Sequence, residues 1–83
     1  MDLKVFEEWV TKYSDIVYRV CYYMTRDREM SSDAMCQVFI ECYKEMRKQP
    51  NPVYKSEKEL GYMAIKMVRK MLKNKKIEQE ENG

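Results

Sequence analysis

Apolar and polar positions along the first half of this chain alternate with the period of an α-helix. Over about residues 3 to 25, apolar side chains recur at steps of three and four: Phe6, Trp9, Tyr13, Ile16, Val17, Val20 and Met24. The segment "TRDREMSS" interrupts this pattern, and Ser31 or Ser32 is suited to cap a second helix that runs to about Lys48. The first half is therefore predicted to form a pair of long amphipathic helices.

A third helix is predicted after "QPNPVYKS", whose prolines end the second helix and stiffen the connection. Ser56 and Glu59 have the spacing of a capping box. The apolar face that follows consists of Leu60, Met63, Ala64, Met67, Met71 and Leu72. The sequence thus predicts an all-α, three-helix domain over residues 1–76, with an acidic tail at 77–83 that is expected to fray.

The second predicted helix has more apolar surface than one core can cover. Its apolar residues from Met30 to Met46 span an arc of about 200°, against the roughly 100° that packing on one core requires. One edge of this arc carries Cys36 and Ile40 and merges with polar positions: Asp33, Gln37, Glu41 and Lys44. We therefore expect a partner to cover this mixed edge.

Composition excludes several classes of function. A chain of 83 residues forms one small domain, and it contains no His and no Gly-rich phosphate loop. Its three cysteines, Cys21, Cys36 and Cys42, lie within apolar faces and lack metal-ligand spacing, so we expect buried free thiols. We expect a binding protein without catalytic residues, metal or cofactor.

The small net charge of +2 conceals three blocks. Residues 1–43 hold five Lys/Arg and eight Asp/Glu, residues 44–76 hold eleven and three, and residues 77–83 hold three Glu, so the blocks carry −3, +8 and −3. A domain polarised in this way is suited to an anionic partner on one side. Nucleic acid is the leading candidate.

The third helix gathers cations and an aromatic ring on the face opposite its apolar stripe. These residues are Lys58, Tyr62, Lys66, Arg69, Lys70 and Lys73, and Tyr54 and Lys55 precede them in the connection. Cations neutralise phosphates, and an aromatic ring among them can stack on an unpaired base. An ordinary solvated lysine face is the alternative, and the sequence leaves it open.

The segments "FEEWVTKYSDIVYRV", "DREMSSDAMCQVFIECYKEM" and "SEKELGYMAIKMVRKMLKNKK" together resemble region 2 of the sigma-70 family, especially the extracytoplasmic-function sigma factors. The resemblance extends from Phe6 to Lys76. Its most specific part is "DAMCQVF", Asp33 to Phe39, where the family typically has Asp-Leu-x-Gln-Glu-x-Phe. This resemblance implies a helical domain that takes part in transcription initiation.

In the family, that segment docks on the coiled coil of the RNA polymerase beta-prime subunit. The resemblance carries this role to Asp33, Cys36, Gln37, Ile40 and Glu41. Cys36 stands where the family usually has Gln, and Gln37 where it has Glu, so we expect docking that is weaker or that needs the help of another protein.

The resemblance also implies contact with single-stranded DNA of the minus-ten promoter element. In the family, the loop before the third helix holds a flipped base, and the basic and aromatic face of the helix guides the opened strand. By position these contacts fall to Tyr54, Lys55, Lys58, Tyr62, Lys66 and Arg69. Lys70 stands where the family frequently has Asn, and Leu60 and Met63 replace the usual Phe and Trp.

A sigma factor normally has a further helix-turn-helix domain, region 4, and the present sequence contains no such pattern. It resembles most the small co-sigma subunits of the RsoA type, from the two-subunit sigma factors of Bacillus, in which a partner sigma subunit supplies region 4. The acidic ending favours such a separate small protein over a fragment. With no apolar run of about 20 residues and an acidic start, we expect a cytoplasmic protein without a membrane span.

Two other interpretations stay open. One is a helical adaptor or anti-sigma-like protein that binds polymerase or a sigma factor without contacting DNA. The other is a general nucleic-acid-binding helical bundle that has no polymerase-docking surface.

Overall fold

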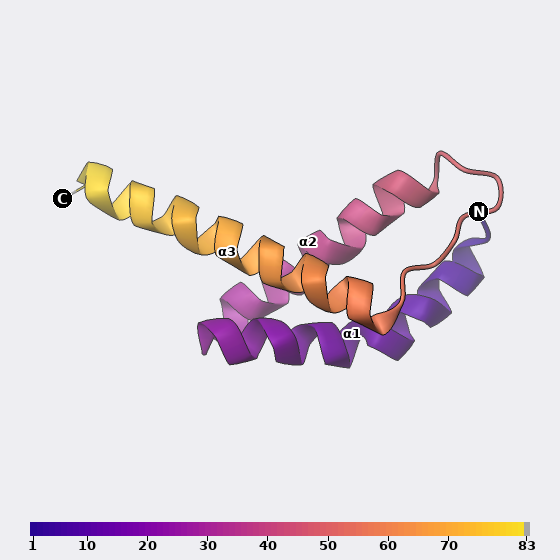
Figure 1. Cartoon of the computed structure of the whole chain (residues 1–83), viewed down its shortest axis with the longest axis horizontal. Coiled ribbons are helices and arrows are strands. Elements are labelled where there is room, and N and C mark those ends of the chain that lie inside the picture. The colour runs from indigo at the N-terminus through magenta and orange to yellow at the C-terminus, as the bar shows by residue number, and fades with distance from the viewer. Residues whose placement is uncertain (83) are drawn as a thin grey trace.

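The computed structural model contains three helices, α1 (Leu3–Thr25), α2 (Arg28–Met46) and α3 (Glu57–Asn82) (Figure 1). It describes the backbone of residues 1–82 and the side chains of residues 1–75. The prediction of an all-α, three-helix fold is confirmed. Helix α3 includes the backbone of the tail predicted at 77–83 as far as Asn82, while the side chains of this tail lie outside the described residues.

The junction between α1 and α2 is short and sharply turned. Arg26 ends α1 in the left-handed conformation, at φ 54° and ψ 25°, and its amide donates to the Tyr22 carbonyl at 2.8 Å. Asp27 then caps α2, since its carboxylate accepts from the Met30 amide at 3.0 Å. With no further residue between the two helices, α2 must fold back along α1.

The predicted N-cap at Ser31 or Ser32 is therefore wrong, because α2 begins one turn earlier. Asp27 is as good a cap as serine, and it follows the α1 turn directly. Ser31 is instead a buried residue of α2, where its hydroxyl lies 2.6 Å from the Asp27 carbonyl and 2.8 Å from the Thr25 hydroxyl. These contacts tie the start of α2 to the end of α1.

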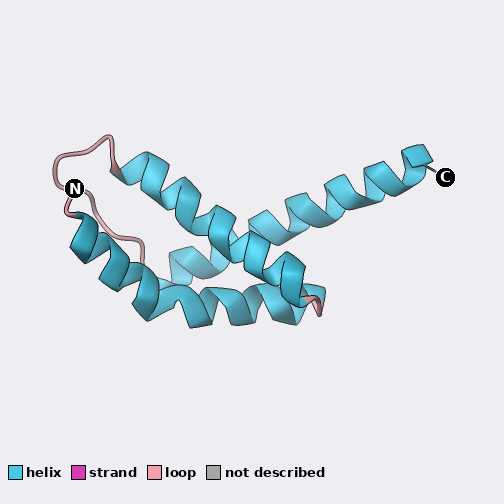
Figure 2. Cartoon of the chain, turned by 180° about the vertical axis from the view of Figure 1, so that it is seen from behind, coloured by secondary structure: helices cyan, strands magenta, loops and turns pink. Residues whose placement is uncertain are grey.

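The connection from α2 to α3 returns past the N-terminal end of α1 (Figures 1 and 2). Helix α2 ends at Met46, two residues before the predicted Lys48. The capping box is confirmed, because the Glu59 amide donates to the Ser56 hydroxyl at 3.2 Å and the Ser56 amide donates to the Glu59 carboxylate at 3.3 Å. The connection is also held by Trp9, whose indole nitrogen donates to the Lys55 carbonyl at 3.2 Å.

All three helices contribute to one core. The buried apolar residues are Trp9, Val17, Cys21, Ala34, Val38, Phe39, Cys42, Met46, Leu60, Ala64 and Val68. Val68 was absent from the predicted apolar face of α3, whereas Leu72, which was included, is 40% exposed. Both views show why Leu72 is exposed: α3 crosses α1 and α2 and continues beyond them (Figures 1 and 2). The later turns of α3 therefore have fewer neighbours to pack against.

Candidate functional site

Five residues predicted to bind polymerase form one exposed stripe on α2. This docking stripe consists of Asp33, Cys36, Gln37, Ile40 and Glu41, and all five side chains are exposed. Their spacing of three, one, three and one residues places them on a single helix face. Ile40 is 43% exposed and lies one residue before Glu41, toward the end of the stripe that is farther from Asp33. The stripe thus has a carboxylate at each end, with Cys36 and Ile40 on either side of Gln37 between them.

Neighbouring helices cover most of the excess apolar surface of α2. Phe39, Cys42 and Met46 are buried, and the Tyr43 ring lies 5.6 Å from that of Phe6, centroid to centroid. The apolar positions of α2 that stay exposed are Cys36 and Ile40 on one edge and, at 36%, Tyr43. The edge that carries Cys36 and Ile40 is the one predicted to meet a partner.

The cysteines do not behave alike, and the expectation that all three are buried is wrong for Cys36. Cys21 and Cys42 lie in the core, where burial raises the pKa of each thiol from 9.0 to about 11; for Cys42 the nearby Lys55 acts in the opposite direction. Cys36 is exposed because it lies at the edge of α2 that borders an open groove toward α3, where no other helix covers it. It is therefore available to a partner.

An open groove runs between the docking stripe and α3. Its α2 side is formed by Asp33, Cys36 and Gln37, and its α3 side by Met67, Lys70, Met71 and Asn74, around a volume of about 390 Å³. The predicted docking residues are therefore bordered by methionine side chains of another helix. A partner lying on the stripe would also meet α3.

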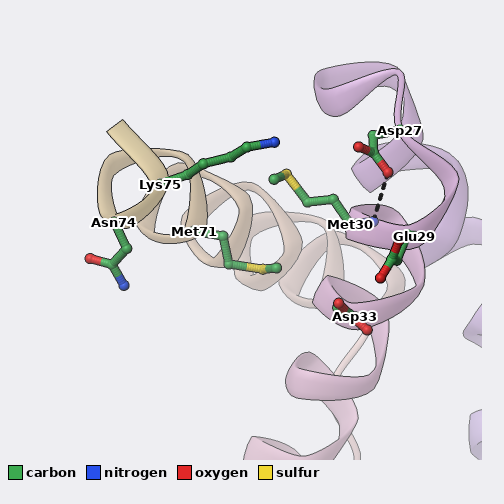
Figure 3. Close-up of a pocket in the computed structure, with 7 residues that line it drawn as sticks. All are labelled: Asp27, Glu29, Met30, Asp33, Met71, Asn74 and Lys75. Carbon is green, nitrogen blue, oxygen red and sulfur yellow. Dashed lines mark hydrogen bonds between the residues drawn. The ribbon is translucent and has the colours of Figure 1, made fainter. Parts of the chain in front are cut away.

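The groove continues toward the start of α2 (Figure 3). This second part has a volume of about 460 Å³ and is lined by Asp27, Glu29, Met30, Asp33, Met71, Asn74 and Lys75. Figure 3 shows carboxylates on the α2 side, and Lys75 reaching across from α3. The end of the groove next to α2 is thus acidic.

Helix α3 exposes the predicted basic face. Lys58, Tyr62, Lys66, Arg69, Lys70 and Lys73 are all exposed, with Tyr62 at 58%. Lys70 lies at the border of this face, because it also lines the groove opposite Asp33 and Gln37. The other five form what we call the α3 basic face: Lys58, Tyr62, Lys66, Arg69 and Lys73.

Tyr54 and Lys55, predicted to extend this face, are half-buried. The Tyr54 ring packs 5.2 Å from that of Trp9, and the Lys55 ammonium lies 3.6 Å from a Glu45 carboxylate oxygen. The Lys55 carbonyl accepts the Trp9 hydrogen bond as well. Both residues thus hold the connection against the core and are not a freely exposed continuation of the α3 basic face.

One exposed surface of α1 was not predicted from the helical periodicity. Arg19 and Tyr23, one helical turn apart, line a groove with Ile65 and Arg69 of α3. The spacing of Arg19 and Tyr23 indicates that they share a helix face. Periodicity does not show, however, whether another helix covers a tyrosine at the edge of an apolar face. That depends on where α3 crosses.

Within the described residues, no three His, Cys, Asp or Glu side chains are grouped so as to hold a metal ion. The same residues include no helix with the length and hydropathy needed to cross a membrane.

In comparisons with known proteins, no family model, no curated protein and no solved structure matches the chain. The class that the fold itself defines is an all-α, three-helix protein. Its surfaces are an exposed stripe on α2 and a basic face on α3.

Proposed function

We propose that this protein is a sigma-70 region-2-like (co-)sigma subunit. It docks on the coiled coil of the RNA polymerase beta-prime subunit through the docking stripe. It engages single-stranded minus-ten promoter DNA through the α3 basic face, and a partner sigma subunit supplies region 4. Transcription initiation takes place in the cytoplasm, so the proposal implies a cytoplasmic protein whose role is binding.

The observation that carries this proposal is that the two surfaces are exposed separately, on different helices. The docking stripe belongs to α2 and the basic face to α3, and they share no residue. Polymerase and promoter DNA can therefore be bound at the same time. A protein with a single anion-binding surface would have no use for the exposed Ile40 edge of α2.

The docking stripe suits an α-helical partner that carries cations. Asp33 and Glu41 are eight residues apart, which on a helix corresponds to about 12 Å. Ile40, next to Glu41, is 43% exposed, so a partner that covers it gains less than half of the about 1.5 to 3 kcal/mol that full burial of an isoleucine side chain contributes. A coiled-coil partner can cover Ile40 while its basic residues pair with the two carboxylates.

The α3 basic face suits single-stranded DNA because it combines four cations with Tyr62. Each cation can neutralise a phosphate, and an exposed tyrosine ring can stack on an unpaired base. On a helix face of this length we expect three to five phosphate contacts, so the free protein should bind DNA weakly.

Calorimetric titration against a purified beta-prime coiled-coil fragment tests the docking surface. We expect binding that the double substitution Asp33→Ala/Gln37→Ala weakens by about 1 to 3 kcal/mol, the scale of lost polar contacts. Asp15→Ala/Gln49→Ala is a matched control, since both of its residues are exposed and lie outside the stripe. Equal affinities for the two double variants and the parent protein would contradict the docking surface.

Charge reversal separates this proposal from the adaptor alternative. In a transcription assay with polymerase and the partner sigma subunit, Lys66→Glu/Arg69→Glu should abolish activation, because these residues face the DNA strand. An adaptor or anti-sigma-like protein would repress transcription, and it would still do so after the same substitution.

A further inference from the structure

A groove lies between the second half of α1 and the middle of α3, and of its lining residues only Arg69 takes part in the function proposed above. This α1–α3 groove is lined by Arg19, Val20, Tyr23, Met24, Ile65 and Arg69 around a volume of about 480 Å³. That volume falls within the roughly 300 to 1,000 Å³ typical of sites for small ligands. Its interior is apolar, and its charged lining residues are the two arginines.

Tyr23 is the most unusual residue of the groove, because its side chain is 74% exposed. The Arg26 guanidinium lies 5.2 Å from the centre of its ring, close enough for a cation–π contact. Two other tyrosines of α1, Tyr18 and Tyr22, stack on each other at 6.1 Å and are half-buried. Tyr23 thus presents aromatic surface that no neighbouring ring covers.

The charge around the groove selects an anionic ligand. Among the described side chains, neither Arg19 nor Arg69 forms an ion pair with a carboxylate. The groove beside the start of α2 differs, because three carboxylates, those of Asp27, Glu29 and Asp33, line it together with a single cation, Lys75. An apolar floor with arginines at its rim fits a ligand that has both a flat apolar part and an attached anion.

Arg69 joins this groove to the α3 basic face. It lines the groove with Ile65, and on the helix surface it lies beside Lys66 and Lys73, three residues before and four residues after it. A strand whose phosphates follow the basic face would therefore pass the mouth of the groove. The part of such a strand that can enter an apolar groove is a base.

We propose that the α1–α3 groove holds an unpaired nucleobase of single-stranded nucleic acid. The base stacks on Tyr23 and covers Ile65 and Met24, while Arg19 and Arg69 bind the phosphates on either side. Duplex DNA does not fit, because its base faces are stacked inside the helix. The inference rests on the proposed function, and it adds α1 to the nucleic-acid surface.

The test compares binding of fluorescent oligothymidylate and of an abasic oligonucleotide of equal length, measured by fluorescence anisotropy at low salt. Both ligands have the same phosphates, but only the first has bases. Tyr23→Ser should weaken oligothymidylate binding by roughly 5- to 150-fold, the range for loss of one stacking contact. It should leave abasic binding unchanged, and Tyr23→Phe should keep the affinity of the parent protein.

Leu3→Ser is the matched control, because Leu3 is another exposed apolar residue of α1 and lies outside the groove. Circular dichroism of each variant verifies that its helices are retained. An equal effect of Tyr23→Ser on the two ligands, or no effect on either, would overturn the base site.

Lys66→Glu/Lys73→Glu distinguishes failure of the groove from failure of the proposed function. If this variant no longer binds either oligonucleotide while Tyr23→Ser binds both normally, the α3 basic face binds nucleic acid and the proposal of a base in the groove is wrong. If the parent protein binds neither oligonucleotide, both the proposed DNA-binding role of the basic face and the proposed base site are wrong.

Discussion

At the scale of single residues, the three cysteines show how strongly position in the fold alters the same chemical group. Cys21 and Cys42 are fully buried, and the Cys42 sulfur lies 3.8 Å from that of Met63. A thiolate in such a place loses its hydration, so burial raises the pKa of both thiols to about 11. Cys36, on the docking stripe, is exposed.

The buried thiols predict a loss of stability at alkaline pH. In the unfolded chain a thiol with a pKa near 9.0 releases its proton above that pH, whereas the buried thiols keep theirs until about pH 11. Between these values the unfolded state binds fewer protons, so the free energy of unfolding falls as pH rises, and the full contribution is present below pH 9. Urea unfolding followed by circular dichroism across this interval measures the loss.

The control for this prediction is the variant Cys21→Ala/Cys42→Ala. Tyrosines and lysines also titrate at high pH, but both proteins contain them, so only the difference between the two slopes reports on the thiols. The parent protein should lose more stability than the variant. Parallel curves would contradict the assignment.

At the scale of elements, α3 has two parts with different roles. Leu60, Ala64 and Val68 are fully buried in the first part. Further along, α3 extends beyond the other helices, and Leu72 is partly exposed although it has the same helical spacing (Figure 1). Packing, and not sequence pattern alone, decides which turns of α3 stabilise the fold.

Two leucine substitutions in α3 measure this difference. Leu60→Ala should lower the free energy of unfolding by about 2 to 5 kcal/mol, because it leaves a cavity at a fully buried position. Leu72→Ala is the matched control, with the same chemistry in the same helix, and should cost less than about 1 kcal/mol. Urea unfolding of the two variants measures both losses. Equal losses of unfolding free energy would contradict the inference that only the first part of α3 is packed in the core.

At the scale of the whole molecule, charge is separated over a body of 48 × 23 × 18 Å. The docking stripe with its two carboxylates lies on α2 and the α3 basic face on α3, and Lys70, which lines the groove beside the stripe, marks the border between them. This separation suits a protein that meets two partners of different chemistry.

The salt dependence of binding to single-stranded DNA tests whether the cations of the α3 basic face contact phosphates. With three to five phosphate contacts, log K should fall against log[salt] with a slope of about −2 to −3.5, since each contact contributes about −0.7. Lys66→Gln/Lys73→Gln should make the slope shallower by about 1.4, because two contacts are removed. Lys4→Gln/Lys12→Gln, a control with the same charge change on exposed positions of α1, should leave the slope unchanged. Titrations by fluorescence anisotropy at several salt concentrations measure all three slopes.

The sequence by itself determined the features that depend on neighbouring residues. The three helices, the bounds of α1 and the capping box of Ser56 and Glu59 agree with the prediction, because helical periodicity and end-capping act over a few residues. The exposed face of α3 and the stripe on α2 also follow from periodicity. The partners of these surfaces remain predictions.

Only the tertiary structure decided which helix edges are covered. It buried Ser31, exposed Cys36, drew Tyr54 and Lys55 against the core, and opened a groove beside Tyr23. Each outcome depends on how helices distant in the sequence cross one another. Helical spacing identifies the residues that share a face, but only contact between helices determines whether solvent reaches that face.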